Sequence, residues 1–171
     1  LTGWQLVTLG LRPTRGSRVL VTGATGAVGR AAVYAAADAG AEVYAGVRLG
    51  REAEVADLPI AGAVDINDLA AVKALGPLDG IADTVGGLTV EHLASLMKPG
   101  GIIASAVSPP PVPDAEHNIK VAPVWVSFDA ATLSAYAARV AKGEFKAPIA
   151  SKFSLADAAE AHRMASKAGL K

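Results

Sequence analysis

Glycines recur in the segment 21–29, which reads VTGATGAVG. Aligned with the dinucleotide-binding pattern G-x-G-x-x-G, Ala24 takes the first position, Gly26 the second and Gly29 the third. A side chain at Gly26 would stand where a diphosphate approaches the backbone. At Gly29, the lack of a side chain lets the next helix lie close to the strand. The free amides and partial positive charge at that helix N-terminus can hold the anion. The segment therefore predicts a dinucleotide site. A tight turn without a ligand is the alternative, and the absence of a following Lys-Ser or Lys-Thr excludes a P-loop.

An arginine stands where many dinucleotide-binding domains carry an acidic residue. About 20 residues past the middle glycine, NAD-binding domains usually place a carboxylate that accepts hydrogen bonds from the adenosine ribose. Here the second predicted strand is followed by Arg48, with Arg51 close enough in sequence to assist. Guanidinium groups pair with a 2′-phosphate, so the sequence predicts NADP (NADPH) as the cofactor. The alternative is a solvated arginine before a helix.

The glycine turn needs a strand before it and a helix after it. Residues 18–22 form a short, nearly all-apolar run, typical of a strand buried on both faces. Apolar residues at spacings of three and four over 28–39 predict a helix that ends at Gly40, with Arg30 and Tyr34 on its other face.

The alternation of strand and helix continues to residue 107. Further strands are predicted at 42–47, 63–66, 80–85 and 102–107, and helices at 51–57, 67–75 and 88–97. We therefore predict an α/β fold, a Rossmann-type doubly wound parallel sheet with helices on both faces. Such a sheet binds its ligand at the carboxyl ends of the strands, where the strand order reverses.

The pattern changes after residue 107. Four prolines predict a loop at 108–113, because proline cannot continue a ladder of hydrogen bonds. Residues 120–128 are predicted as extended, and Asp129 as the cap of a helix. A strand is predicted at 146–153, followed by a final helix.

Ser154 and Asp157 resemble a capping box that opens this last helix. We interpret 1–145 as an NADP(H)-binding domain with a leading helix, and 146–171 as a strand and helix that belong with another domain.

Composition excludes several classes of protein. The 171 residues are 51% hydrophobic and have 16 Lys and Arg against 16 Asp and Glu. A zero net charge argues against nucleic-acid binding, which needs clustered basic residues. The apolar runs are too short to cross a membrane, and the absence of cysteine fits a cytoplasmic location.

Other catalytic chemistries lack their residues. The three histidines do not have the spacing of a zinc site, and no metal is expected. Ser105 and Ser108 are not in a Gly-x-Ser-x-Gly elbow. Asp79 and Asp83 are interpreted as polar groups at strand ends, and His162 as a structural histidine on an apolar face. The catalytic residues remain unknown.

Four segments carry a resemblance to a known family: 11–29, 83–87 (DTVGG), 96–103 (LMKPGGII) and 153–162 (FSLADAAEAH). Together they resemble the medium-chain dehydrogenase/reductase superfamily, in particular its zinc-independent NADPH:quinone oxidoreductase branch. The resemblance implies hydride transfer from NADPH to a small-molecule substrate, a quinone or an activated alkene or carbonyl.

The resemblance also implies a set of cofactor contacts. Arg48 would contact the 2′-phosphate, and residues 124–126 would run past the nicotinamide ring. The pyrophosphate contacts fall on Thr25, Gly26, Ala27 and Val28. The loops near the nicotinamide half hold Val85 and Gly86, and Ser105 and Ala106.

The chain departs from that family at both ends. Members of the family normally begin with a separate substrate domain, and none of it is present before Leu1. They also normally close with a short strand after the last helix, whereas this sequence stops at Lys171. We expect the catalytic half to be missing or on another chain, with an exposed apolar patch or a homodimer contact at 146–153.

A second hypothesis stays open. The turn is also similar to the opening of atypical short-chain dehydrogenases, but no tyrosine is followed four residues later by the lysine of their catalytic pair. The chain is then either the cofactor domain of a reductase or a stand-alone NADP-binding or interaction module without turnover.

Overall fold

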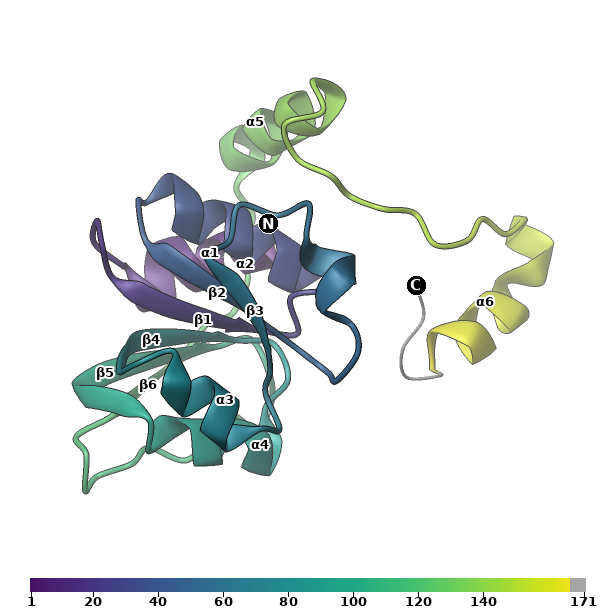
Figure 1. Cartoon of the computed structure of the whole chain (residues 1–171). Coiled ribbons are helices and arrows are strands. Elements are labelled where there is room, and N and C mark those ends of the chain that lie inside the picture. The colour runs from purple at the N-terminus through teal and green to yellow at the C-terminus, as the bar shows by residue number, and fades with distance from the viewer. Residues whose placement is uncertain (167–171) are drawn as a thin grey trace.

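The predicted Rossmann-type fold is confirmed by a computed structural model, in which residues 1–166 are described (Figure 1). Six strands form one parallel sheet in the order β3-β2-β1-β4-β5-β6. Their bounds are β1 Arg18–Thr22, β2 Glu42–Val47, β3 Gly62–Asp65, β4 Leu78–Asp83, β5 Met97–Ser105 and β6 Lys120–Pro123. The order reverses between β1 and β4, so the carboxyl ends of these two strands form the edge where such sheets bind ligands.

Helices cover both faces of the sheet. Their bounds are α1 Thr2–Gln5, the π-helical η1 Leu6–Leu11, α2 Ala27–Asp38, the 3-10 turn η2 Glu52–Val55, α3 Leu69–Ala74, α4 Gly87–Ala94 and α5 Ala130–Ala141. Figure 1 shows α1 and α2 over one face and α3 and α4 over the other. The helix predicted at 51–57 is only the single turn η2.

Alternate residues of β1 explain why both faces are covered. Val19 and Val21 belong to the apolar core with Val33 of α2. Leu20 points to the opposite face and joins a second core with Leu93 of α4. All five are fully buried or nearly so. Burial of the three strand residues is what the unbroken apolar run of β1 predicts.

Several predicted boundaries shift. The helix predicted at 88–97 ends at Ala94, because Met97 already pairs with Leu78 in the sheet. Consequently β4 and β5 begin and end earlier than the predicted 80–85 and 102–107.

The cap and extended stretch before α5 follow the prediction in part. The Asp129 carboxylate accepts the Thr132 amide at 2.9 Å, so the predicted cap of α5 is confirmed. Of the stretch predicted as extended over 120–128, only β6 joins the sheet.

The strand predicted at 146–153 is wrong. These residues run outside the sheet without a strand partner and lead to η3 Leu155–Asp157 and α6 Ala158–Ala165, which lie apart from the sheet in Figure 1. The predicted capping box is also wrong in detail, because the Ser154 hydroxyl donates to the Asp157 carboxylate and neither side chain caps a backbone amide.

The exposed apolar residues expected in the C-terminal segment are present. Ile149 is 72% exposed and Leu155 is 93% exposed, and none of the residues of α6 is buried. Among residues 1–166, no helix combines the length and apolar character needed to cross a membrane.

Candidate functional site

The turn between β1 and α2 is built around the carbonyl group of Gly23. Gly23 has a φ of +65°, a left-handed conformation that favours glycine. Its carbonyl oxygen accepts a hydrogen bond from the Gly26 amide at 2.9 Å. A Cβ atom on Gly29 would lie 2.2 Å from the same oxygen, so a side chain does not fit there. The close packing predicted at Gly29 is confirmed.

Gly26 has no such constraint from the protein. Its φ of −83° and ψ of 164° are extended backbone that other residues adopt readily. It is exposed, and a Cβ atom there would meet only the Gly23 carbonyl oxygen, at an ordinary contact distance of 3.4 Å. A requirement for glycine at this position would therefore come from a bound group and not from packing.

The N-terminus of α2 presents unpaired backbone donors beside Gly26. No side chain caps this helix, and the amides of Ala27, Val28 and Gly29 have no acceptor within residues 1–166. Because α2 has 12 residues, these amides carry a partial positive charge of roughly half a unit. The residues present therefore fit an anionic group such as a diphosphate.

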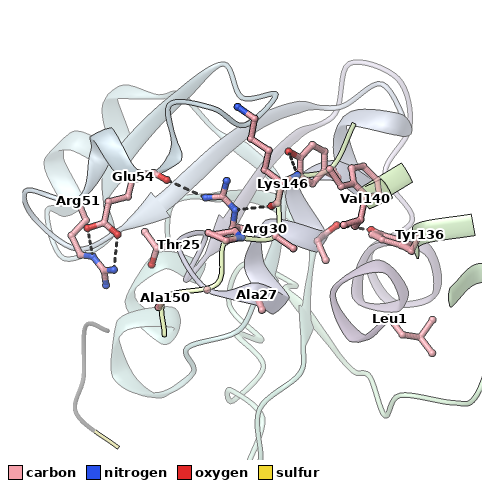
Figure 2. Close-up of a pocket in the computed structure, with 16 residues that line it drawn as sticks. Leu1, Thr25, Ala27, Arg30, Arg51, Glu54, Tyr136, Val140, Lys146 and Ala150 are labelled. Atoms are coloured by element: carbon pink, nitrogen blue, oxygen red, sulfur yellow. Dashed lines mark hydrogen bonds and ion pairs between the residues drawn. The ribbon is translucent and has the colours of Figure 1, made fainter. Parts of the chain in front are cut away.

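A cavity of about 520 Å³ opens beside the turn. Its walls come from the turn, α2, η2 and the segment 145–150. Figure 2 shows Arg51 and Glu54 at one end and Leu1 and Tyr136 at the other. Of the predicted site residues, the cavity wall includes Thr25, Gly26, Ala27 and Arg51.

The two arginines predicted as phosphate readers differ in their surroundings. Arg48 directly follows β2 and is exposed, and its side chain has no hydrogen-bonding or ionic partner in the described part of the chain. Arg51 forms a two-point ion pair with Glu54, with Nε to Oε1 at 3.0 Å and Nη2 to Oε2 at 2.6 Å. The hydrogen bond that Arg51 donates to the Glu54 carboxylate raises the pKa of the Arg51 guanidinium, although burial opposes the shift.

Asp83, predicted as a polar group at a strand end, is the centre of a buried hydrogen-bond network. Its Oδ1 accepts the Thr22 hydroxyl and the amides of Val85 and Gly86, each at 2.9 Å. Its Oδ2 accepts the Ser105 hydroxyl at 2.8 Å. The network joins the carboxyl ends of β1, β4 and β5.

The residues predicted near the nicotinamide half lie together beside the turn, outside the cavity wall. Ser105 is 1% exposed and its hydroxyl is held by Asp83, so this side chain is structural. The Ala106 amide donates to the Asp83 carbonyl oxygen at 3.0 Å. Val85 is partly exposed, and a Cβ atom on Gly23 would lie 3.2 Å from its Cγ2.

Arg30 and Tyr34, predicted on a face of their helix other than the apolar one, are both buried. Arg30 donates to the Asp57 carboxylate at 2.5 Å and to the carbonyl oxygens of Glu54 at 3.1 Å and Lys146 at 3.3 Å. The Tyr34 hydroxyl accepts the Lys146 amide at 3.1 Å. Because the covering residue is 116 positions from Arg30, helical periodicity alone does not reveal this burial.

Asp57 carries the charge opposite Arg30. Burial raises the pKa of the Asp57 carboxyl, but the hydrogen bond and charge of Arg30 outweigh burial and leave that pKa below its ordinary value. The buried guanidinium is therefore neutralised locally.

The acidic and histidine side chains form no metal site in the described residues. In residues 1–166, no group of three His, Asp or Glu side chains converges in a way that could hold a metal ion. His162, predicted as a structural histidine, is exposed on α6.

Comparison with known proteins places the chain in a family. A family model described as zinc-binding dehydrogenase matches residues 54–169. A comparison with curated protein sequences finds no match.

Solved structures share the fold across almost the whole chain. A quinone oxidoreductase from Coxiella burnetii superposes with a TM-score of 0.83 at 20% identity, over 96% of this chain and 53% of its own. A thermostable alcohol dehydrogenase from Pyrobaculum aerophilum gives a TM-score of 0.80 at 24% identity, over 99% and 53%. CurA from Vibrio vulnificus, solved with NADPH, gives 0.64 at 21% identity, over 86% and 52%. The chain thus spans about half the length of these proteins.

Proposed function

The chain belongs to the zinc-binding dehydrogenase family of the medium-chain dehydrogenases and reductases, and from that premise we propose that it is the NADPH-binding half of an oxidoreductase. The observation that carries the proposal is the bare, exposed backbone at Gly26 next to the unpaired amides of α2. A diphosphate fits both features, because it needs close backbone approach and several N–H donors.

Each part of the nucleotide has residues proposed for it. The diphosphate lies against Thr25 and Gly26 and takes hydrogen bonds from the amides of Ala27, Val28 and Gly29. Arg48 pairs with the 2′-phosphate, since its side chain is exposed and has no partner in the described part of the chain. The loops after β4 and β5, with Val85, Gly86, Ser105 and Ala106, line the nicotinamide half through their backbone.

A bound nicotinamide supplies hydride to the substrate, and the protein orients it. We propose a quinone or an activated alkene or carbonyl as the acceptor. The likeness of fold to the Coxiella quinone oxidoreductase supports this class. The substrate contacts and any proton donor are assigned to the half of the enzyme that this chain does not span. Independence of zinc, a cytoplasmic location and a homodimer stay predictions.

Retention on immobilised adenosine 2′,5′-bisphosphate tests the cofactor assignment. We expect the chain to bind this matrix and to elute with NADP⁺ at a concentration at which NAD⁺ leaves it bound. Equal elution by both nucleotides, or no retention, would contradict the proposal.

An assay of NADPH oxidation with a panel of quinones separates the two hypotheses about turnover. Turnover by the chain with any quinone rejects a stand-alone module without activity. Binding without turnover, together with turnover after the substrate half is supplied, supports a cofactor domain. Continued inactivity with that half present supports the module.

A further inference from the structure

Arg51 and Glu54 face each other at one end of the cavity (Figure 2). Both carboxylate oxygens of Glu54 are engaged by the Arg51 guanidinium, at 3.0 and 2.6 Å. The side chains are 19% and 25% exposed, so the pair is only partly screened by solvent. A pair with this fork geometry is stronger and more specific than a single-point contact.

Glu54 is also held in place through its backbone. Its carbonyl oxygen accepts Nη1 of Arg30 at 3.1 Å, and its amide donates to the Arg51 carbonyl oxygen at 3.0 Å within η2. Arg30 is itself buried and paired with Asp57. These backbone hydrogen bonds therefore hold Glu54 where its carboxylate can pair with Arg51.

The arginines that contact or precede η2 differ in whether a carboxylate pairs with them. Arg30 and Arg51 each have a carboxylate partner, whereas Arg48 has none among the described residues. Arg48 lies just before η2, where its carbonyl oxygen accepts a hydrogen bond from the Arg51 amide at 3.1 Å, so a phosphate group bound at this turn would find the Arg48 guanidinium unpaired. To reach Arg51 it must displace Glu54 or lie beside a like charge, which is unfavourable at close range.

We propose that Glu54 sets the nucleotide preference of this site by masking Arg51, so that Arg48 alone is offered to a 2′-phosphate. The inference rests on the proposed function, because it assumes that the adenosine end of the nucleotide lies near η2. By this inference Glu54 is a specificity-determining residue. Arg51 is a second cation that could bind phosphate if Glu54 did not pair with it.

The variant Glu54→Gln tests the mask, because glutamine keeps the size of the side chain and removes its charge. We expect the ratio of the dissociation constants for NADH and NADPH to rise about tenfold, the effect of one additional charge-assisted hydrogen bond. Glu52→Gln is the matched control. It makes the same charge change on the same turn, at a residue with no ion pair in the described chain, and should leave the ratio nearly unchanged.

Arg51→Gln completes the experiment as a double-mutant cycle. In the wild-type background it should weaken NADPH binding, because it removes the cation opposite Glu54 and leaves the charge of that carboxylate to repel the 2′-phosphate. In the Glu54→Gln background it should abolish the gain. Urea unfolding of each variant checks that the fold is kept.

Several results would overturn the inference. A ratio that stays constant in Glu54→Gln, or that rises equally in Glu52→Gln, rejects the mask. Weaker NADH binding with unchanged NADPH binding would instead make Glu54 an acceptor for ribose hydroxyls. Failure of the wild type to bind either nucleotide would reject the proposed function and this inference together, whereas the other outcomes leave the proposed function intact.

Discussion

The backbone at Gly29 lies so close to the carbonyl oxygen of Gly23 that a Cβ atom on Gly29 would be 2.2 Å from it. At Gly26, the same construction gives 3.4 Å to the same oxygen. The turn therefore contains one glycine that packing requires and another that packing does not. Substitutions at these two positions separate the requirements of folding from those of ligand binding.

Gly29→Ala should destabilise the protein by about 3 kcal/mol, because the backbone of α2 must move away from the strand to admit a methyl group. Urea unfolding followed by circular dichroism measures the loss. A change in unfolding free energy as small as that of an exposed substitution would show that the turn is less tightly packed than its geometry indicates.

Gly26→Val should keep the fold but weaken nucleotide binding. Its side chain points into open space, so we expect a loss of stability of about 1 kcal/mol, typical of replacing glycine at a helix N-cap. The same side chain stands in the path of a diphosphate and should reduce affinity roughly tenfold or more. Paired measurements of urea unfolding and NADPH fluorescence give both quantities. Unchanged affinity would remove Gly26 from the site.

Much of the fold could be predicted because its signals are local. The apolar run of β1, the three- and four-residue spacing of α2 and the glycine at position 29 each reflect neighbours within one strand-turn-helix unit. The glycine-rich turn between β1 and α2 could be placed for the same reason.

The errors come from contacts between residues distant in the chain. Arg30, predicted off the apolar face of its helix, is buried and donates a hydrogen bond to the Lys146 carbonyl oxygen. Asp83 accepts hydrogen bonds from residues of β1 and β5, which the sequence of its own strand does not reveal. The segment 146–153, predicted as a strand, runs outside the sheet and pairs with none of the strands in the described part of the chain. The masking of Arg51 depends on a side-chain rotamer, which sequence does not determine.

Arg48→Glu should weaken NADPH binding about tenfold to a hundredfold, because it removes a charge-assisted hydrogen bond and adds a repulsive charge. NADH, which lacks the 2′-phosphate, should be affected far less. Arg15→Glu is the control, since Arg15 is exposed before β1 at the opposite end of the strand. Equal losses for the two nucleotides would show that Arg48 does not read the phosphate. The difference should shrink as salt is added.

Asp83→Ala should cost about 3 kcal/mol of stability or more, because it leaves several buried donors without an acceptor. Asp83→Asn should cost less, since its amide oxygen can replace Oδ1 and its amide nitrogen can donate to the Ser105 hydroxyl. Chemical denaturation of both variants measures the difference. Equal losses would mean that the negative charge, and not the hydrogen-bond pattern, stabilises the strand ends.

Ionisation of the Tyr136 phenol should lower the stability of the protein at high pH. The Tyr136 ring packs against the rings of Trp4 and Phe145, with centroid distances of 4.9 and 4.6 Å. Its hydroxyl donates a hydrogen bond to the Ala31 carbonyl oxygen at 3.1 Å. Burial, and then the negative charge of Asp38, raise the pKa of the phenol above its ordinary value. The folded state therefore keeps a proton that the unfolded state releases above about pH 10.

It follows that the stabilising contribution of the phenol is complete below that pH and declines as the pH rises further. The difference in unfolding free energy between the wild type and Tyr136→Phe should shrink between moderately and strongly alkaline solution. Urea unfolding of both proteins at moderately and at strongly alkaline pH measures this difference. Parallel changes in the two proteins would place the Tyr136 hydroxyl in a solvent-like environment.

Calorimetric titration of the chain with NADPH, with Gly26→Val titrated in parallel, tests the central claim most directly. We expect a saturable heat at one nucleotide per chain for the wild type and a much weaker titration for the variant, although both proteins are folded. No saturable heat with NADPH or NADH, or identical curves for the two proteins, would contradict the assignment of the turn as a diphosphate site.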